Sequence, residues 1–126
     1  LTFMNNSGIC IRELIEYFKI DADDVIVFHD DIDVEFGKIK AKFGGSSAGH
    51  NGIASIDKFI GKDYSRVRVG IGKPKENIEV GDFVLQNFDE DEMINIEKIS
   101  NDINNSILIL VEKKLDLFSS TVNNTK

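Results

Sequence analysis

The amino-acid sequence predicts an α/β fold in which helices sandwich a mixed β-sheet. Segments that are rich in β-branched residues, or that alternate between apolar and polar residues, are separated by segments with apolar residues at helical spacing. This succession is typical of helices packed on a sheet. With 126 residues, 41% of them apolar, the chain is long enough to bury one core. We therefore expect a single domain over residues 1–126.

Three elements are expected in the first half of the chain. Apolar residues at helical spacing over residues 8–20 predict a helix, with Ser7 as its N-cap. The apolar run at residues 24–30 predicts a strand that ends near Asp30. Residues 38–43 alternate strictly, which predicts a strand with a basic face and an apolar face. The basic face carries Lys38, Lys40 and Lys42.

Three further elements are expected in the second half. Residues 51–61 have the apolar spacing of a helix that ends at a glycine. Residues 65–74 alternate as a strand and are stopped by glycine and proline. Apolar spacing from residue 89 to about residue 117 predicts a C-terminal helix, with an interruption near residues 101–105. The polar composition of residues 119–126 is typical of a frayed end.

The chain carries a net charge of −7 and one cysteine, Cys10. A single cysteine excludes a disulfide framework, offers no metal-ligand spacing and favours a reducing, cytoplasmic compartment. A uniformly acidic surface would repel nucleic acid. The charge is unevenly spread, however, because residues 38–75 hold nine basic and two acidic side chains. Either this segment forms a surface for a phosphate-bearing partner, or its basic residues are ordinary solvated ones.

Two groups of polar side chains at the ends of predicted elements are candidates for a site. Asn5 precedes the first helix and is either a site residue or a capping residue. Asp30, Asp31 and Asp33 follow an apolar strand. They either shape a turn or ligate a divalent metal, although their spacing lacks the glycine and the later glutamate of a calcium loop.

A third candidate is the segment FGGSSAGHNGI, residues 43–53, which contains four of the ten glycines. Glycines allow backbone amides to approach a ligand, and the start of the following helix favours an anion. The segment matches neither a Walker loop nor a dinucleotide fingerprint. Asn51 could donate a hydrogen bond to a carbonyl or an oxyanion, or it could cap the helix. His50 could be a base or a structural residue.

The chain resembles the bacterial-type peptidyl-tRNA hydrolases in four ordered segments: TFMNNSG (2–8), VIVFHDDIDVEFGKIKAKFGGSSAGHNGIASI (25–56), YSRVRVGIGKP (64–74) and VGDFVLQNF (80–88). The resemblance implies an enzyme that hydrolyses the ester between a peptide and the 3′-terminal ribose of tRNA, without a metal or an organic cofactor. It also implies a cytoplasmic protein that acts on peptidyl-tRNA, has no membrane partner and is a monomer when intact.

The same resemblance implies roles for individual residues. Asp30 matches the carboxylate that orients and polarises a catalytic histidine, as a buried Asp does in hydrolase triads. Asn5 and Asn51 match asparagines that position the substrate and the attacking water, with Gly49 and His50 beside the substrate. The positions that bind tRNA phosphates in the family correspond to Lys40, Lys42 and Arg68.

The general base departs from the family pattern. In the family it is a histidine near the N-terminus, after a strand and a Gly-Asn-Pro-Gly type loop, and neither His29 nor His50 matches it. The resemblance therefore implies that an N-terminal strand and helix are missing, that an apolar sheet edge is exposed, and that the 126 residues alone hydrolyse nothing. The alternative function is a non-catalytic tRNA- or ribosome-binding module on the same scaffold.

Overall fold

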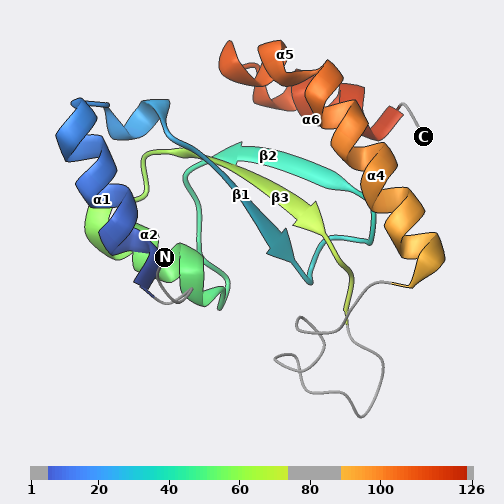
Figure 1. Cartoon of the computed structure of the whole chain (residues 1–126), viewed down its shortest axis with the longest axis horizontal. Coiled ribbons are helices and arrows are strands. Elements are labelled where there is room, and N and C mark those ends of the chain that lie inside the picture. Colours follow the sequence, from blue (N-terminus) through green and yellow to red (C-terminus); the bar gives the residue numbers. More distant parts are fainter. Residues whose placement is uncertain (1–5, 74–88, 125–126) are drawn as a thin grey trace. The chain divides into compact units, whose positions relative to one another are not determined.

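The computed structural model describes residues 6–73 and 89–124. The chain divides into two compact units, whose elements Figure 1 shows in sequence colours. The first unit contains residues 1–29 and 42–67, and the second contains residues 30–41 and 68–126. The unit boundary falls within each of the three strands in the described part of the chain, so each of these strands contributes residues to both units.

The three strands form one sheet in the order β1-β3-β2. They are β1 (Ile26–Asp31), β2 (Ile39–Phe43) and β3 (Ser65–Gly70). The Ser65 amide donates to the Val25 carbonyl and the Ile71 amide donates to the Asp31 carbonyl, so residue numbers rise together along the two segments. Because of this, β1 and β3 are parallel, as their arrows in Figure 1 show.

The pairing of β2 with β3 has the opposite sense. The Gly44 amide donates to the Tyr64 carbonyl, whereas the Gly70 amide donates to the Lys38 carbonyl. Residue numbers rise in one segment as they fall in the other, so β2 is antiparallel to β3. The predicted α/β fold with a mixed sheet is confirmed.

The first unit has its core between two helices and the strand residues that it contains. Buried Ile53, Ile56 and Tyr64 form this core, and Ile11 and Val27 are among the half-buried residues that pack against it. The helices are α1 (Ser7–Phe18) and α2 (Asn51–Ile60), and a short 3₁₀ turn, η2 (Ala22–Asp24), precedes β1. The predicted positions of both helices and of β1 are confirmed to within a few residues.

The start of α1 differs from the prediction. Ser7 is the first helical residue rather than the cap, and Asn6 occupies the cap position without a side-chain hydrogen bond to the helix. A neighbouring helix supplies a partner for one of the first amides of α1, because the Gly8 amide donates to Ser55 Oγ of α2 at 3.0 Å. The contact between helices thus replaces a local cap.

Between residues 89 and 124, the structure has three helices instead of the single one predicted from residue 89 to about residue 117. They are α4 (Glu90–Asn105), α5 (Ile107–Val111) and α6 (Leu115–Asn124). A capping box fixes the start of α4, since Asp89 accepts from the Glu92 amide and Glu92 accepts from the Asp89 amide. The predicted interruption occurs just after residues 101–105, at the buried Ser106.

The expected frayed end over residues 119–126 is wrong for the described part, because α6 continues to Asn124. Phe118 and Val122, one helical turn apart, are both fully buried. Polar residues of α6 bind the outer edge of β2 within the same unit. Ser119 Oγ accepts from the Ala41 amide at 2.8 Å, and Asn123 both accepts from the Ile39 amide at 2.9 Å and donates to the Ile39 carbonyl at 2.8 Å.

The opposite edge of the sheet is formed by β1, whose only strand neighbour among the described residues is β3. Phe28 of β1 is 44% exposed. Within residues 6–73 and 89–124, no helix combines the length and the apolar character needed to cross a bilayer.

Candidate functional site

The start of α2 carries His50 and Asn51 at the end of a loop of residues 44–50, called here the glycine loop. His50 has an extended backbone, and its Nδ1 accepts from the Ile53 amide at 3.2 Å. His50 is therefore the N-cap, and the alternative in which Asn51 caps the helix is wrong. An imidazole that accepts at Nδ1 must carry its proton on Nε2 when it is neutral.

Because His50 caps the helix, the side-chain amide of Asn51 does not serve as the cap. Asn51 is the first residue of α2 and is exposed. Its side chain makes no hydrogen bond to any residue in the described part of the chain. A carboxamide with both donor and acceptor open to solvent, beside a helix start, is suited to bind a carbonyl or a developing oxyanion.

Glycine gives the loop a backbone that few other residues could adopt. Gly44, Gly45 and Gly49 have φ angles of 70°, 106° and 83°, in the region that residues with a side chain rarely occupy. At Gly49, a Cβ would meet no heavy atom within 4 Å, so the surface there is open. The loop also bonds to itself, since the His50 amide donates to the Ser47 carbonyl at 2.9 Å.

A second histidine lies against this loop. The ring of His29, near the end of β1, is 5.1 Å from the ring of His50 between centroids, at an interplanar angle of 72°. Both histidines belong to the first unit. Asp30 follows His29 directly in β1, is half-buried and belongs to the second unit. Asn5 lies outside the described residues.

The acidic residues after Asp30 form a turn. Asp31 Oδ1 accepts from the Asp33 amide at 2.8 Å, and Asp31 Oδ2 is 3.3 Å from Arg68 Nη1. Asp33 points to solvent, with Lys73 Nζ 4.0 Å away. These contacts favour the turn over the metal site, and the three carboxylates do not converge.

In the described ranges, the carboxylates that do lie together are those of Asp21, Asp23 and Asp24, within 4.8 Å of one another. All three are exposed. Exposed acidic residues are commonly solvated without an ion, so this cluster indicates no metal site.

The predicted exposed basic face holds for two of its three lysines, because Lys38 precedes β2 and is half-buried. Lys40 and Lys42 are exposed and alternate with buried Ile39 and Ala41. Phe43, which was predicted on the apolar face with them, is 45% exposed. Arg66 of β3 is only 3% exposed. Arg68 is 33% exposed and contacts Asp31, so part of its charge is already compensated. Lys40 and Lys42 are therefore the freer candidates for phosphate binding.

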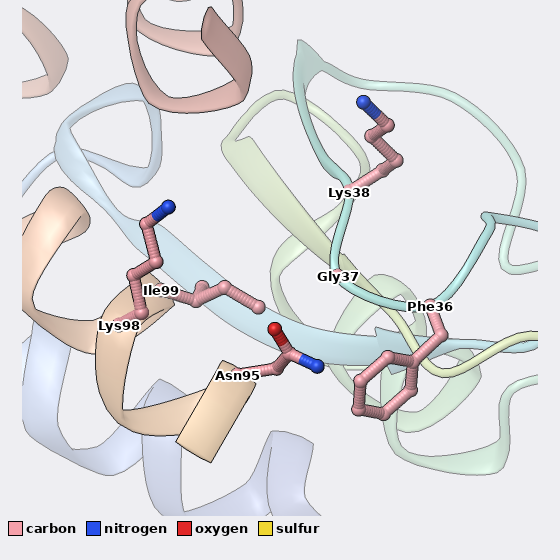
Figure 2. Close-up of a pocket in the computed structure, with 6 residues that line it drawn as sticks. All are labelled: Phe36, Gly37, Lys38, Asn95, Lys98 and Ile99. Carbon is pink, nitrogen blue, oxygen red and sulfur yellow. The ribbon is translucent and has the colours of Figure 1, made fainter. Parts of the chain in front are cut away.

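A shallow hollow of about 160 Å³ lies in the described part of the second unit (Figure 2). Phe36, Gly37 and Lys38 line it from the segment before β2, and Asn95, Lys98 and Ile99 line it from α4. Figure 2 shows the Asn95 amide directed towards the ring of Phe36, while both lysine side chains extend away from that ring. None of the predicted site residues lines this hollow.

Comparisons with known proteins decide the family. A family model described as peptidyl-tRNA hydrolase matches residues 1–126. The chain belongs to the peptidyl-tRNA hydrolase family. The peptidyl-tRNA hydrolase of Pelagibacter ubique is 78% identical over 124 residues, which are 98% of this chain and 67% of that protein. The peptidyl-tRNA hydrolase of Aliarcobacter butzleri is 47% identical, over 91% of this chain and 63% of that protein.

Solved structures of peptidyl-tRNA hydrolases have the same fold. The crystal structure of the Acinetobacter baumannii peptidyl-tRNA hydrolase matches with a TM-score of 0.87 and 28% identity. This match covers 98% of the present chain and 63% of the crystallised one. Like the curated relatives, it is longer than the present chain, which spans about two thirds of the length of the proteins that it matches.

Proposed function

We propose that the protein hydrolyses peptidyl-tRNA, so that water cleaves the ester between the peptide and the 3′-terminal ribose and the tRNA is recycled. The observation that carries this proposal is the exposed amide of Asn51, which the His50 cap leaves available at the start of α2 in a chain of this family. Its NH₂ group donates to the ester carbonyl and stabilises charge on that oxygen. Gly49 and His50 border the bound substrate.

We propose that the general base comes from outside these 126 residues. His50 is a poor candidate because its Nδ1 already accepts the Ile53 amide and its Nε2 carries the proton of the neutral ring. Asp30 orients the base, and Asn5 helps to hold the peptide or the water, as the family resemblance implies. By this proposal, the 126 residues bind substrate weakly and do not cleave it.

The tRNA phosphates are proposed to bind the basic face of β2. Lys40 and Lys42 are exposed on alternate residues of one strand, so their ammonium groups share a face. Arg68 contributes less, because it is half-buried beside Asp31. We further propose that the protein acts in the cytoplasm and as a monomer.

Cleavage of an N-acyl-aminoacyl-tRNA, with a chelator present, tests the enzymatic proposal. It should be measured for this chain and for the longest reading frame that contains it. We expect cleavage by the longer protein only, and a loss of about 10²-fold or more on Asn51→Ala, as for other single oxyanion donors. Asn101→Ala, at an exposed asparagine of α4, is the matched control and should keep full activity.

Three results would contradict parts of the proposal. Cleavage by the 126 residues alone would mean that His29 or His50 serves as the base. Loss of cleavage in the chelator would mean that a metal takes part. Binding of tRNA without cleavage, even by the longer protein, would favour the non-catalytic binding module.

A further inference from the structure

A buried charged cluster joins three segments of the first unit and has no task in the proposed chemistry. It consists of Asp57 in α2, Tyr64 just before β3, Arg66 in β3, and the carbonyl of Ser46 in the glycine loop. Arg66 Nη2 is 2.7 Å from Asp57 Oδ1, and Arg66 Nη1 donates to the Ser46 carbonyl at 3.0 Å. Tyr64 Oη donates to the same Asp57 oxygen at 2.7 Å.

The cluster is deeply buried. Arg66 and Tyr64 are 3% and 0% exposed, and the Asp57 side chain is 10% exposed. The Arg66 guanidinium also lies over the Tyr64 ring, 4.7 Å from its centroid. Buried charges are tolerated only when they are paired and hydrogen-bonded, so removal of either charged partner leaves the other uncompensated.

The hydrogen bonds of Arg66 indicate that it holds the glycine loop in position. An arginine that only neutralises a carboxylate commonly forms a two-pronged fork with it. Arg66 instead directs one terminal nitrogen to α2 and the other to the glycine loop, and its Nε is buried with no hydrogen-bond partner in the described residues. Arg66 thus bridges α2 and the glycine loop, but its Nε does not form the second hydrogen bond of a fork with Asp57.

The contacts close a ring through the candidate site. Arg66 holds the Ser46 carbonyl, and the Ala48 amide donates to Ser46 Oγ at 3.1 Å. The loop ends at His50, which caps α2. Asp57, further along α2, accepts a hydrogen bond from Arg66, and this contact completes the ring. Ala48 adopts a φ of 47°, a strained conformation that persists only where its surroundings hold it.

We propose that Asp57 and Arg66 are positioning residues, which fix the glycine loop against α2 and thereby fix His50 and Asn51. The part of this proposal that concerns substrate rests on the proposed function. Arg66 thus acts through the loop and not as a phosphate ligand, although it lies in the basic segment of the sequence.

Amide hydrogen exchange in the 126-residue chain tests the positioning directly. Asp57→Asn removes the charge partner of Arg66, and we expect exchange of the Ala48 and His50 amides to accelerate by at least about tenfold, the effect of one charge-assisted hydrogen bond. The Gly8 amide, which binds Ser55 elsewhere in this unit, should keep its rate. Asp63→Asn, the same change at an exposed position, is the control and should alter none of them.

Arg66→Lys gives a second variant that keeps the charge. A lysine ammonium is a compact donor without two diverging nitrogens, so it cannot span both acceptors as the guanidinium does. We expect loop exchange to accelerate here too. If the loop amides are unchanged in both variants, or if Gly8 accelerates equally with them, the cluster is only a stabilising contact and the proposal is overturned.

Cleavage by the longer protein gives the functional readout. Asp57→Asn should lower kcat more than it raises KM, because the substrate still binds its phosphate contacts while Asn51 is misplaced. A faster-exchanging loop with unchanged kcat would overturn the link to the site. If the unmodified longer protein does not cleave the substrate, the proposed function fails, whereas the exchange result still decides whether Asp57 and Arg66 position the loop.

Discussion

At the scale of single residues, His50 performs a task that Ser, Thr, Asp or Asn usually performs at a helix start. Its Nδ1 must be free of a proton to accept from the Ile53 amide. The cap therefore fixes the tautomer of a histidine beside the site. Capping preference alone pointed to Asn51, because asparagine is among the most favoured N-cap residues, and the sequence carries no signal that ranks a histidine above it.

Replacing His50 separates its capping task from the rest of its side chain. His50→Ala removes the acceptor for the Ile53 amide, so we expect the free energy of unfolding to fall by about 1 kcal/mol. His50→Asn supplies another acceptor and should recover much of this loss. Denaturant unfolding of the 126-residue chain measures both variants. Equal stability of the alanine and asparagine variants would show that the cap contributes little.

Tyr64 should make stability depend on alkaline pH. Burial, together with its hydrogen bond to Asp57, raises the pKa of Tyr64 above its ordinary value. The folded state thus favours the neutral phenol, so this contribution to stability is complete below the unfolded pKa of about 10 and declines as pH rises above it. Unfolding measured as a function of pH should show this decline, and Tyr64→Phe should reduce it. An identical alkaline decline in that variant would exclude Tyr64 as its source.

At the scale of elements, close packing fixes the contact of α1 with α2. A Cβ on Gly8 would lie 2.2 Å from the Ser55 carbonyl oxygen and 2.7 Å from the Phe59 ring, which is closer than real side chains approach. The backbone atom cannot move aside without shifting the helix. This glycine is therefore required by packing, although its backbone is helical.

Gly8→Ala tests this packing. We expect the free energy of unfolding to fall by roughly 1–3 kcal/mol, the usual cost of overpacking a core, in spite of the higher helix propensity of alanine. Ala54→Gly, at an exposed position of α2, reports the size of the propensity effect alone. If Gly8→Ala is neutral or stabilising, the two helices separate at low cost.

The spacing and alternation of apolar residues predicted the helices and strands whose buried faces depend on local sequence alone. The alternation of residues 38–43 predicted the burial pattern of residues 39–42, although Phe43 is exposed. The spacing of Ile53, Ile56 and Ile60 predicted α2. The end of the chain could not be predicted in this way. Ser119 and Asn123 read as a polar tail, but they bind backbone atoms of β2 that are 78 and 84 residues away in sequence.

At the scale of the whole chain, the uneven charge identified a basic segment inside an acidic protein. Strand alternation, and not the charge count, correctly predicted that Lys40 and Lys42 are exposed. It could not separate them from Arg66, which has the same charge and a similar pattern but is buried with Asp57. Tertiary pairing, which composition does not encode, makes that difference.

The salt dependence of tRNA binding tests the basic face. Under the proposed function, Lys42→Ala removes one phosphate contact, so tRNA affinity should fall and the slope of log affinity against log salt should decrease by about 0.7 to 0.9. Lys114→Ala, which removes the same charge from an exposed lysine outside the basic segment, should leave both unchanged. Equal effects of the two variants would point to net charge instead of a local contact.

The contacts between α6 and β2 have a consequence during protein synthesis. Asn123 binds the backbone of Ile39, which lies 84 residues earlier in the chain. At ribosomal rates of about 5–20 residues per second, the 84 residues that follow Ile39, up to and including Asn123, take roughly 4 to 17 seconds to be made. Throughout that interval the outer edge of β2 lacks the partner that closes it. An exposed strand edge is a template for pairing with other chains, so neighbouring nascent chains on a polysome can pair through this edge before Asn123 is made.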